Sequence, residues 1–123
     1  MASRSFRRAV TASASPGPTL KFGKGVLNLV SFTTDADDTV SLPQTQAGDI
    51  GKEIDVYAVQ GFEVISAEAA GKVNNVTVGA TNELAIVAGT FVKFKCVAAD
   101  TWLTVESTLI DGTQTQLVPD ALA

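Results

Sequence analysis

The feature that most constrains the fold is a pair of segments, Thr90–Ala98 and Trp102–Ser107, in which apolar and polar residues alternate. A period of two is typical of a β-strand that buries one of its faces. The short link between the two segments predicts a hairpin whose apolar side chains share one sheet face. The side chains predicted to face inward are Val92, Phe94, Cys96 and Ala98 on the first strand, and Leu103 and Val105 on the second.

Other short segments rich in β-forming residues extend this pattern along the chain. They are Val26–Thr33, Thr39–Leu42, Glu53–Ala58, Phe62–Ser66, Val76–Val78 and Leu84–Val87, with turn-forming residues between them. Short strands at near-regular spacing predict an all-β domain, as an antiparallel β-sandwich, a jelly roll or a barrel. Helix is expected for no more than a turn or two, and one helical turn is assigned to Ala67–Gly71.

The N-terminal part of the chain differs from the rest in charge and composition. Residues 1–24 contain five of the nine basic residues and no acid, whereas residues 25–123 contain all thirteen acids. Residues 9–19 are mainly small, and two prolines flank Gly17. Such a segment lacks the apolar side chains that would offset the entropy of ordering it. The sequence therefore predicts an extended basic arm over residues 1–25 and a β-domain over residues 26–123.

The residue types that usually carry catalysis are scarce. The chain has no histidine, and its one cysteine, Cys96, falls on the apolar face of a predicted strand. Asp35, Asp37 and Asp38 resemble a calcium loop, but an EF-hand starting at Asp35 requires glycine and glutamate at its sixth and twelfth positions, where Val40 and Gln46 stand. The sequence thus predicts no enzyme, no metal site and no cofactor. A hydrolase that works through carboxylates alone is the remaining catalytic alternative.

Partners and location are constrained by charge and hydropathy. No apolar run is long enough to span a membrane as a helix, which predicts a chain made in a reducing cytoplasm and without a membrane partner. The Ser- and Arg-rich start also fits an organelle transit peptide. Nucleic acid is disfavoured as a partner of the acidic domain. Charged residues make up only 18% of the chain, which fits either self-association or a well-packed monomer.

Two aromatic residues, Tyr57 and Trp102, are candidates for a ligand platform. Rings with apolar faces and polar tips can stack on a sugar or a receptor, but packing in the core or at an interface is the preferred interpretation. Both interpretations stay open from the sequence alone.

Several motifs between Ser41 and Ser107 resemble those of small β-rich structural proteins of tailed bacteriophages. The resemblance rests on Ser41-Leu42-Pro43 and Gly48, followed by a strand that reads Gly51-Lys52-Glu53-Ile54-Asp55-Val56-Tyr57. A turn at Gly71–Asn75 and a late hairpin from Phe91 to Trp102 complete the pattern.

The resemblance implies a virion component on the capsid surface that is commonly trimeric. We therefore expect a non-catalytic capsid decoration, or cement, protein that forms a homotrimer and binds the major capsid protein or another virion protein. The alternative is a carbohydrate- or receptor-binding β-module of a phage fibre or tail. The residues expected to contact the shell lie in the arm and are Arg4, Phe6, Arg7, Arg8 and Lys21.

Overall fold

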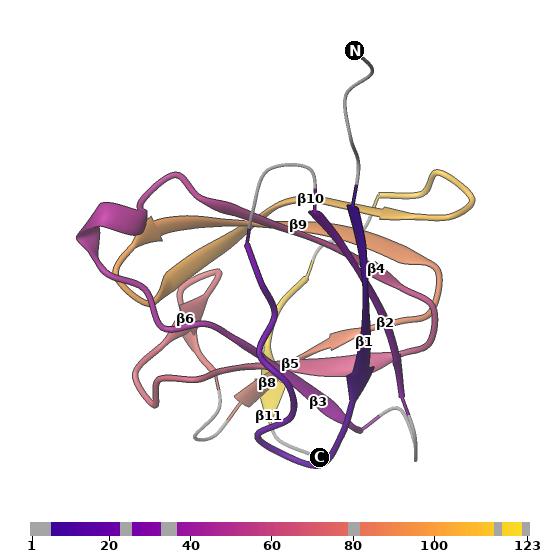
Figure 1. The fold of residues 1–123 in the computed structure, drawn as a ribbon, viewed down its shortest axis with the longest axis horizontal. Helices are drawn as coiled ribbons and strands as arrows, with labels where there is room; N and C mark the ends of the chain where they lie inside the picture. The colour runs from indigo at the N-terminus through magenta and orange to yellow at the C-terminus, as the bar shows by residue number, and fades with distance from the viewer. Residues whose placement is uncertain (1–5, 23–25, 33–36, 79–81, 115–116, 122–123) are drawn as a thin grey trace.

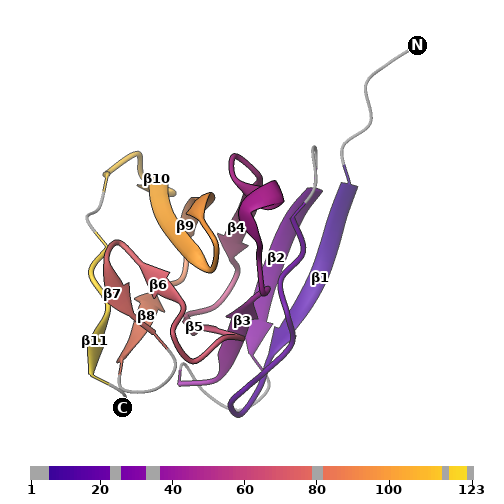
Figure 2. The same ribbon diagram turned by 90° about the vertical axis from the view of Figure 1, so that its left-hand side faces the viewer.

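The computed structural model describes residues 6–22, 26–32, 37–78, 82–114 and 117–121. In these residues the chain forms two β-sheets that enclose one hydrophobic core (Figures 1 and 2). A single turn of 3-10 helix, η1 (Ala47–Asp49), interrupts the strands. The predicted all-β class is confirmed, and the architecture is a β-sandwich.

The larger sheet has seven strands in the order β1-β2-β4-β9-β10-β6-β7. Figure 2 shows β1, β2, β4, β9 and β10 following one another from right to left. The bounds of the seven strands are β1 (Phe6–Ala12), β2 (Val26–Phe32), β4 (Glu53–Ala58), β9 (Thr90–Ala98), β10 (Thr101–Leu109), β6 (Lys72–Val73) and β7 (Val76–Thr77).

The smaller sheet has four strands in the order β11-β8-β5-β3. Its strands are β11 (Asp120–Ala121), β8 (Asn82–Ile86), β5 (Phe62–Ser66) and β3 (Thr39–Leu42). The predicted segments for β2 to β5, β8 and β9 therefore all form strands, within a residue or two of the predicted ends. The helical turn expected at Ala67–Gly71 is absent, and those residues form turns and bends.

Pairing within both sheets is mixed, whereas the sequence predicted antiparallel sheets. The β9–β10, β4–β9 and β5–β8 pairs are antiparallel as expected. The β1–β2, β2–β4, β3–β5 and β6–β10 pairs are parallel. Alternation reports which face of a strand is buried, and it carries no information on the direction of the neighbouring strand.

The β9–β10 hairpin forms as predicted, but the inward face of β10 was predicted wrongly. Trp102 lies opposite Cys96 and is fully buried, whereas Leu103 and Val105 face outward. The register of the pair shifts between Thr104 and Glu106, which is the mark of a β-bulge. Because burial of an indole ring removes more apolar surface from water than burial of Leu103, the face that carries Trp102 turns inward.

The core lies between the two sheets and is built from alternate residues of both. From the larger sheet come side chains such as Val30, Ile54, Val56, Phe94 and Trp102. The smaller sheet contributes Val40, Leu42, Phe62, Val64, Leu84 and Ile86. Cys96 is a free, fully buried cysteine in this core, as the alternation of β9 predicted.

The N-terminal segment departs most from prediction. Regular structure was expected to begin at Val26, yet Phe6–Ala12 forms β1, in register with β2 from Phe6 opposite Val26 to Ala12 opposite Phe32. Val10 and Ala12 are buried in the core. Leu20, in the connection to β2, is buried there as well. Residues 6–22 are thus built into the β-domain and do not form a separate arm.

The connection after β1 crosses from the larger sheet to the smaller one. Ser13 exchanges two backbone hydrogen bonds with Thr39 on the edge strand β3, at 3.1 and 2.6 Å. Farther along, Ser41 donates its N–H to Pro18 O (2.9 Å), and Leu20 donates its N–H to Ser41 O (2.8 Å). Gly17 permits the approach, because it has a φ of +65° and a Cβ there would lie 2.0 Å from Thr39 O.

This placement predicts that a substitution at Leu20 destabilises the whole domain. Leu20→Ala removes a fully buried side chain, so we expect the free energy of unfolding to fall by about 2–5 kcal/mol in urea denaturation. Val59→Ala, at a position that is 53% exposed, is the control and should change it by less than about 0.5 kcal/mol. Equal effects of the two substitutions would contradict the placement of residues 6–22 in the core.

Candidate functional site

The basic residues expected to contact a partner take different positions on and near β1. Arg7 is exposed. Arg8 is half-buried and donates hydrogen bonds from Nη1 to Thr19 O and to Asn28 Oδ1, both at 3.3 Å. Because neighbouring residues of a strand point to opposite faces, Arg7 is free for a partner while Arg8 faces the interior. The sequence did not predict that one of these arginines is exposed and the other is hydrogen-bonded within the fold.

Asn28 connects the guanidinium of Arg8 to the rest of the sheet. Its side chain is fully buried, and Nδ2 donates to Asp55 O at 2.9 Å and to Lys21 O at 3.2 Å. All the hydrogen-bonding groups of this buried amide therefore have partners, as burial of a polar group requires. The network fixes the connection after β1 against β2 and β4.

The other predicted contact residues are placed in part. Lys21 is exposed in the connection between β1 and β2. Phe6 is the first residue of β1, and the position of its side chain lies outside the described structure. Arg4 lies outside the described residues.

The predicted platform of Tyr57 and Trp102 is wrong. Trp102 is fully buried, and its neighbour across the strand pair is Cys96. Tyr57 is half-buried on β4 and points away from the core, since Val56 and Ala58 on either side of it are core residues. The two rings lie on opposite faces of the larger sheet and cannot stack on one ligand.

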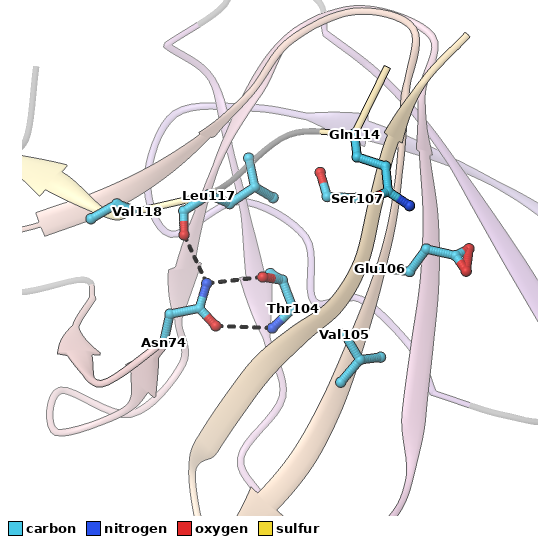
Figure 3. Close-up of a pocket in the computed structure, with 8 residues that line it drawn as sticks. All are labelled: Asn74, Thr104, Val105, Glu106, Ser107, Gln114, Leu117 and Val118. Carbon is cyan, nitrogen blue, oxygen red and sulfur yellow. Dashed lines mark hydrogen bonds between the residues drawn. The ribbon is translucent and has the colours of Figure 1, made fainter. Parts of the chain in front are cut away.

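A groove runs between β10 and the C-terminal segment (Figure 3). Its volume is about 540 Å³. Asn74, the residue that follows β6, joins the two sides of the groove. Its Nδ2 donates hydrogen bonds to Thr104 Oγ1 (2.9 Å) and to Leu117 O (2.8 Å). The Asn74 Oδ1 accepts the Thr104 N–H at 3.0 Å. Asn74 has a φ of +50°, the left-handed conformation that asparagine tolerates better than most residues.

The groove offers limited chemistry to a ligand. The amide of Asn74 is occupied by its own chain, and the exposed polar groups on the lining are the Glu106 carboxylate and the Gln114 amide. Val105 and Val118 add exposed apolar surface, and no aromatic ring lines the groove. Sugar-binding sites commonly contain an aromatic ring that stacks on the flat face of the sugar. The described lining residues include no such ring, so we interpret the groove as a gap between strands and not as a sugar site.

One acidic side chain is buried in the smaller sheet. Glu63 on β5 is 9% exposed, and its Oε2 has no hydrogen-bond partner in the part of the chain that the structure describes. Burial, together with the negative charges of Glu83, Asp120 and Asp37, raises the pKa of Glu63 to about 7. At neutral pH this carboxyl is therefore poised between its neutral and charged forms.

Three of these acids lie on separate strands of the smaller sheet. Glu63 of β5 lies opposite Ala85 of β8, and Glu83 of β8 lies opposite Asp120 of β11. Among the described residues, no three His, Cys, Asp or Glu side chains are grouped so that they could hold a metal ion. The feature that sets this region apart is the raised pKa of Glu63. The sequence contains one sign of it, a single charged residue within Phe62–Ser66, a strand in which all five residues are buried.

In the described ranges, no helix has the length and apolar character needed to cross a membrane.

The pKa of Glu63 predicts how stability changes with pH. Because the folded state raises this pKa above its ordinary value of 4.5, the stabilising proton is bound at low pH and lost as pH rises toward 7. The free energy of unfolding should fall over this range, by at most about 3 kcal/mol.

Glu63→Gln should remove most of this fall and leave the variant more stable than the wild type at pH 8. Urea denaturation at several pH values measures the effect, and Glu106→Gln, at an exposed position, is the control. Parallel pH profiles for the wild type and Glu63→Gln would contradict the assignment.

Comparison of the chain with protein-family models, with curated proteins and with solved structures finds no match.

Proposed function

We propose that this chain is a non-catalytic capsid decoration protein of a tailed bacteriophage, attached to the outer shell through its N-terminal strand. The observation that carries the proposal is the open outer edge of β1. This strand ends the larger sheet, and its outer edge has no partner strand among the described residues. It also carries the exposed guanidinium of Arg7.

An open edge strand is a surface on which a partner can add a strand. The outward backbone N–H and C=O groups of β1 can pair with an extended segment of a shell protein, and side chains then select the partner. The N-terminal 24 residues contain only basic charges, so an acidic segment of the major capsid protein is the partner that their charge favours.

Because β1 is ordered within the domain, attachment through it would cost less conformational entropy than attachment through a loose arm. A loose arm loses about 1–2 kcal/mol of backbone entropy per residue when it is ordered on a surface. Because β1 is already paired with β2 over seven residues, this cost is met when the domain folds. The strand is therefore preorganised for binding, which raises affinity without additional contacts.

The alternative, a carbohydrate- or receptor-binding module, has weaker support. It relied on Trp102, which is fully buried, and the groove beside β10 lacks an aromatic ring. The resemblance to phage structural proteins also agrees with a binding role that involves no reaction. We therefore prefer the decoration role and propose the virion surface as the location of the protein.

The proposal predicts that charge reversal at Arg7 weakens binding to shells. Arg7→Glu should lower the affinity about tenfold or more in co-sedimentation with shells assembled from the major capsid protein of the same genome. Lys72→Glu, at an exposed base on β6, is the matched control and should leave binding nearly unchanged.

Arg7 is exposed, so the substitution should not alter the urea midpoint of the isolated protein. Wild-type protein that stays in the supernatant with such shells would refute the decoration role. Equal binding by Arg7→Glu and the wild type would refute attachment through β1.

A further inference from the structure

The outward side of the larger sheet, called here the outer face, carries exposed apolar side chains. Leu103 and Val105 on β10 are 40% and 48% exposed, and Val97 on β9 is 38% exposed. Tyr57 and Phe91 lie opposite each other on β4 and β9 and are half-buried. Aromatic and aliphatic residues grouped in this way are enriched where proteins meet other proteins.

The same face carries seven charged residues. Lys72 on β6 lies opposite Thr101, and the signs of the other six alternate across the strands. One row of paired residues crosses the sheet from β1 to β10. It consists of Arg7 on β1, Leu27 on β2, Asp55 on β4, Lys93 on β9 and Glu106 on β10. In the next row, Glu53 lies opposite Lys95.

These charges are only loosely paired within the chain. Glu53 Oε1 is 3.8 Å from Lys93 Nζ, and Glu53 Oε2 is 3.8 Å from Lys95 Nζ. Both lysine side chains keep a third or more of their surface exposed. At such distances and exposures an ion pair contributes little to stability, so Glu53, Lys93 and Lys95 remain available to a partner. Asp55 is half-buried and its Oδ1 is shielded from water, so it contributes less to this surface.

The charges of the outer face nearly balance, unlike those of the rest of the chain. The face has four bases, Arg7, Lys72, Lys93 and Lys95, and three acids, Glu53, Asp55 and Glu106, which gives it a net charge of +1. The other residues therefore carry a formal net charge of −5, since the whole chain carries −4. Two copies of this acidic protein repel each other over most orientations, and the net repulsion is smallest when their outer faces meet.

We propose that two copies of this chain associate face to face through the outer face of the larger sheet. The contact is isologous: each copy presents the same alternating rows of acid and base, so bases of one copy face acids of the other across a two-fold axis. Val97, Leu103 and Val105 supply apolar area, and stacked sheets lie about 10 Å apart.

A partner of another class fits this surface less well. Nucleic acid and anionic membranes select a face with excess positive charge, and a strongly basic protein selects excess negative charge. A nearly neutral face with both signs interleaved fits a second copy of itself better, because bases of one copy can then face acids of the other. This inference does not depend on the decoration role, because it concerns the isolated protein in solution, and it gives two copies where the resemblance implies three.

Sedimentation velocity over a concentration series tests the contact directly. We expect the wild type to sediment as two copies at high concentration, and Leu103→Glu to raise the dissociation constant at least about tenfold. Val87→Glu places the same charge at a residue that is 58% exposed and outside the outer face, and should behave as wild type. A wild-type monomer at every concentration, or a mass of three copies, would overturn the proposal.

A charge-exchange experiment separates the contact from any effect on folding. One variant carries Lys93→Glu and Lys95→Glu, and the other carries Glu53→Lys and Glu106→Lys. Each alone should stay monomeric because like charges meet across the axis, whereas an equimolar mixture should form the two-copy species. A mixture that stays monomeric while both variants keep the far-UV circular dichroism of the wild type would show that this face does not mediate association.

Discussion

The backbone hydrogen bonds of residues 6–22 to both sheets are the constraint on which the rest of the structure depends. β1 extends the larger sheet through its parallel pairing with β2, and the residues that follow it bind the edge of β3 in the smaller sheet. One continuous segment thus closes one side of the sandwich. Val10 and Leu20 enter the core from this segment, so closing the side also completes the hydrophobic contact between the layers.

This arrangement leaves distinct surfaces for distinct roles. The outer edge of β1 offers backbone groups and the guanidinium of Arg7, whereas the outer face beside it offers nearly balanced charges and apolar side chains. The smaller sheet carries the buried carboxyl of Glu63, whose proton makes folding sensitive to pH. Edge and face adjoin at Arg7, so copies that associate through the face would present two β1 edges on one particle. Such a pair could bind a repeating shell with raised effective concentration at the second site.

The sequence was sufficient to predict the all-β class and most strands because alternation over segments such as Glu53–Ala58 and Thr90–Ala98 reports burial directly. β1 was missed because Phe6–Ala12 contains two arginines and small residues, and its strand conformation comes from pairing with β2, not from its own propensity. The inward face of β10 was missed because alternation assigns the two faces equally well until the bulge near Val105 and the burial of Trp102 are known.

The candidate sites were less predictable for the same physical reason. Arg7 and Arg8 are adjacent and chemically identical, and only the direction of each side chain makes one exposed and the other a hydrogen-bond donor within the fold. The pKa of Glu63 depends on burial by strands far apart in sequence. Neither can be read from a local pattern.

Amide hydrogen exchange of the isolated protein, followed residue by residue along β1, tests the central claim most directly. If β1 is part of the fold, about every second amide of Phe6–Ala12 should be protected by its hydrogen bond to β2, while the alternate amides, which face the open edge, exchange quickly. Exchange of all β1 amides at the rate of an unstructured chain, with β9 amides still protected, would contradict the account.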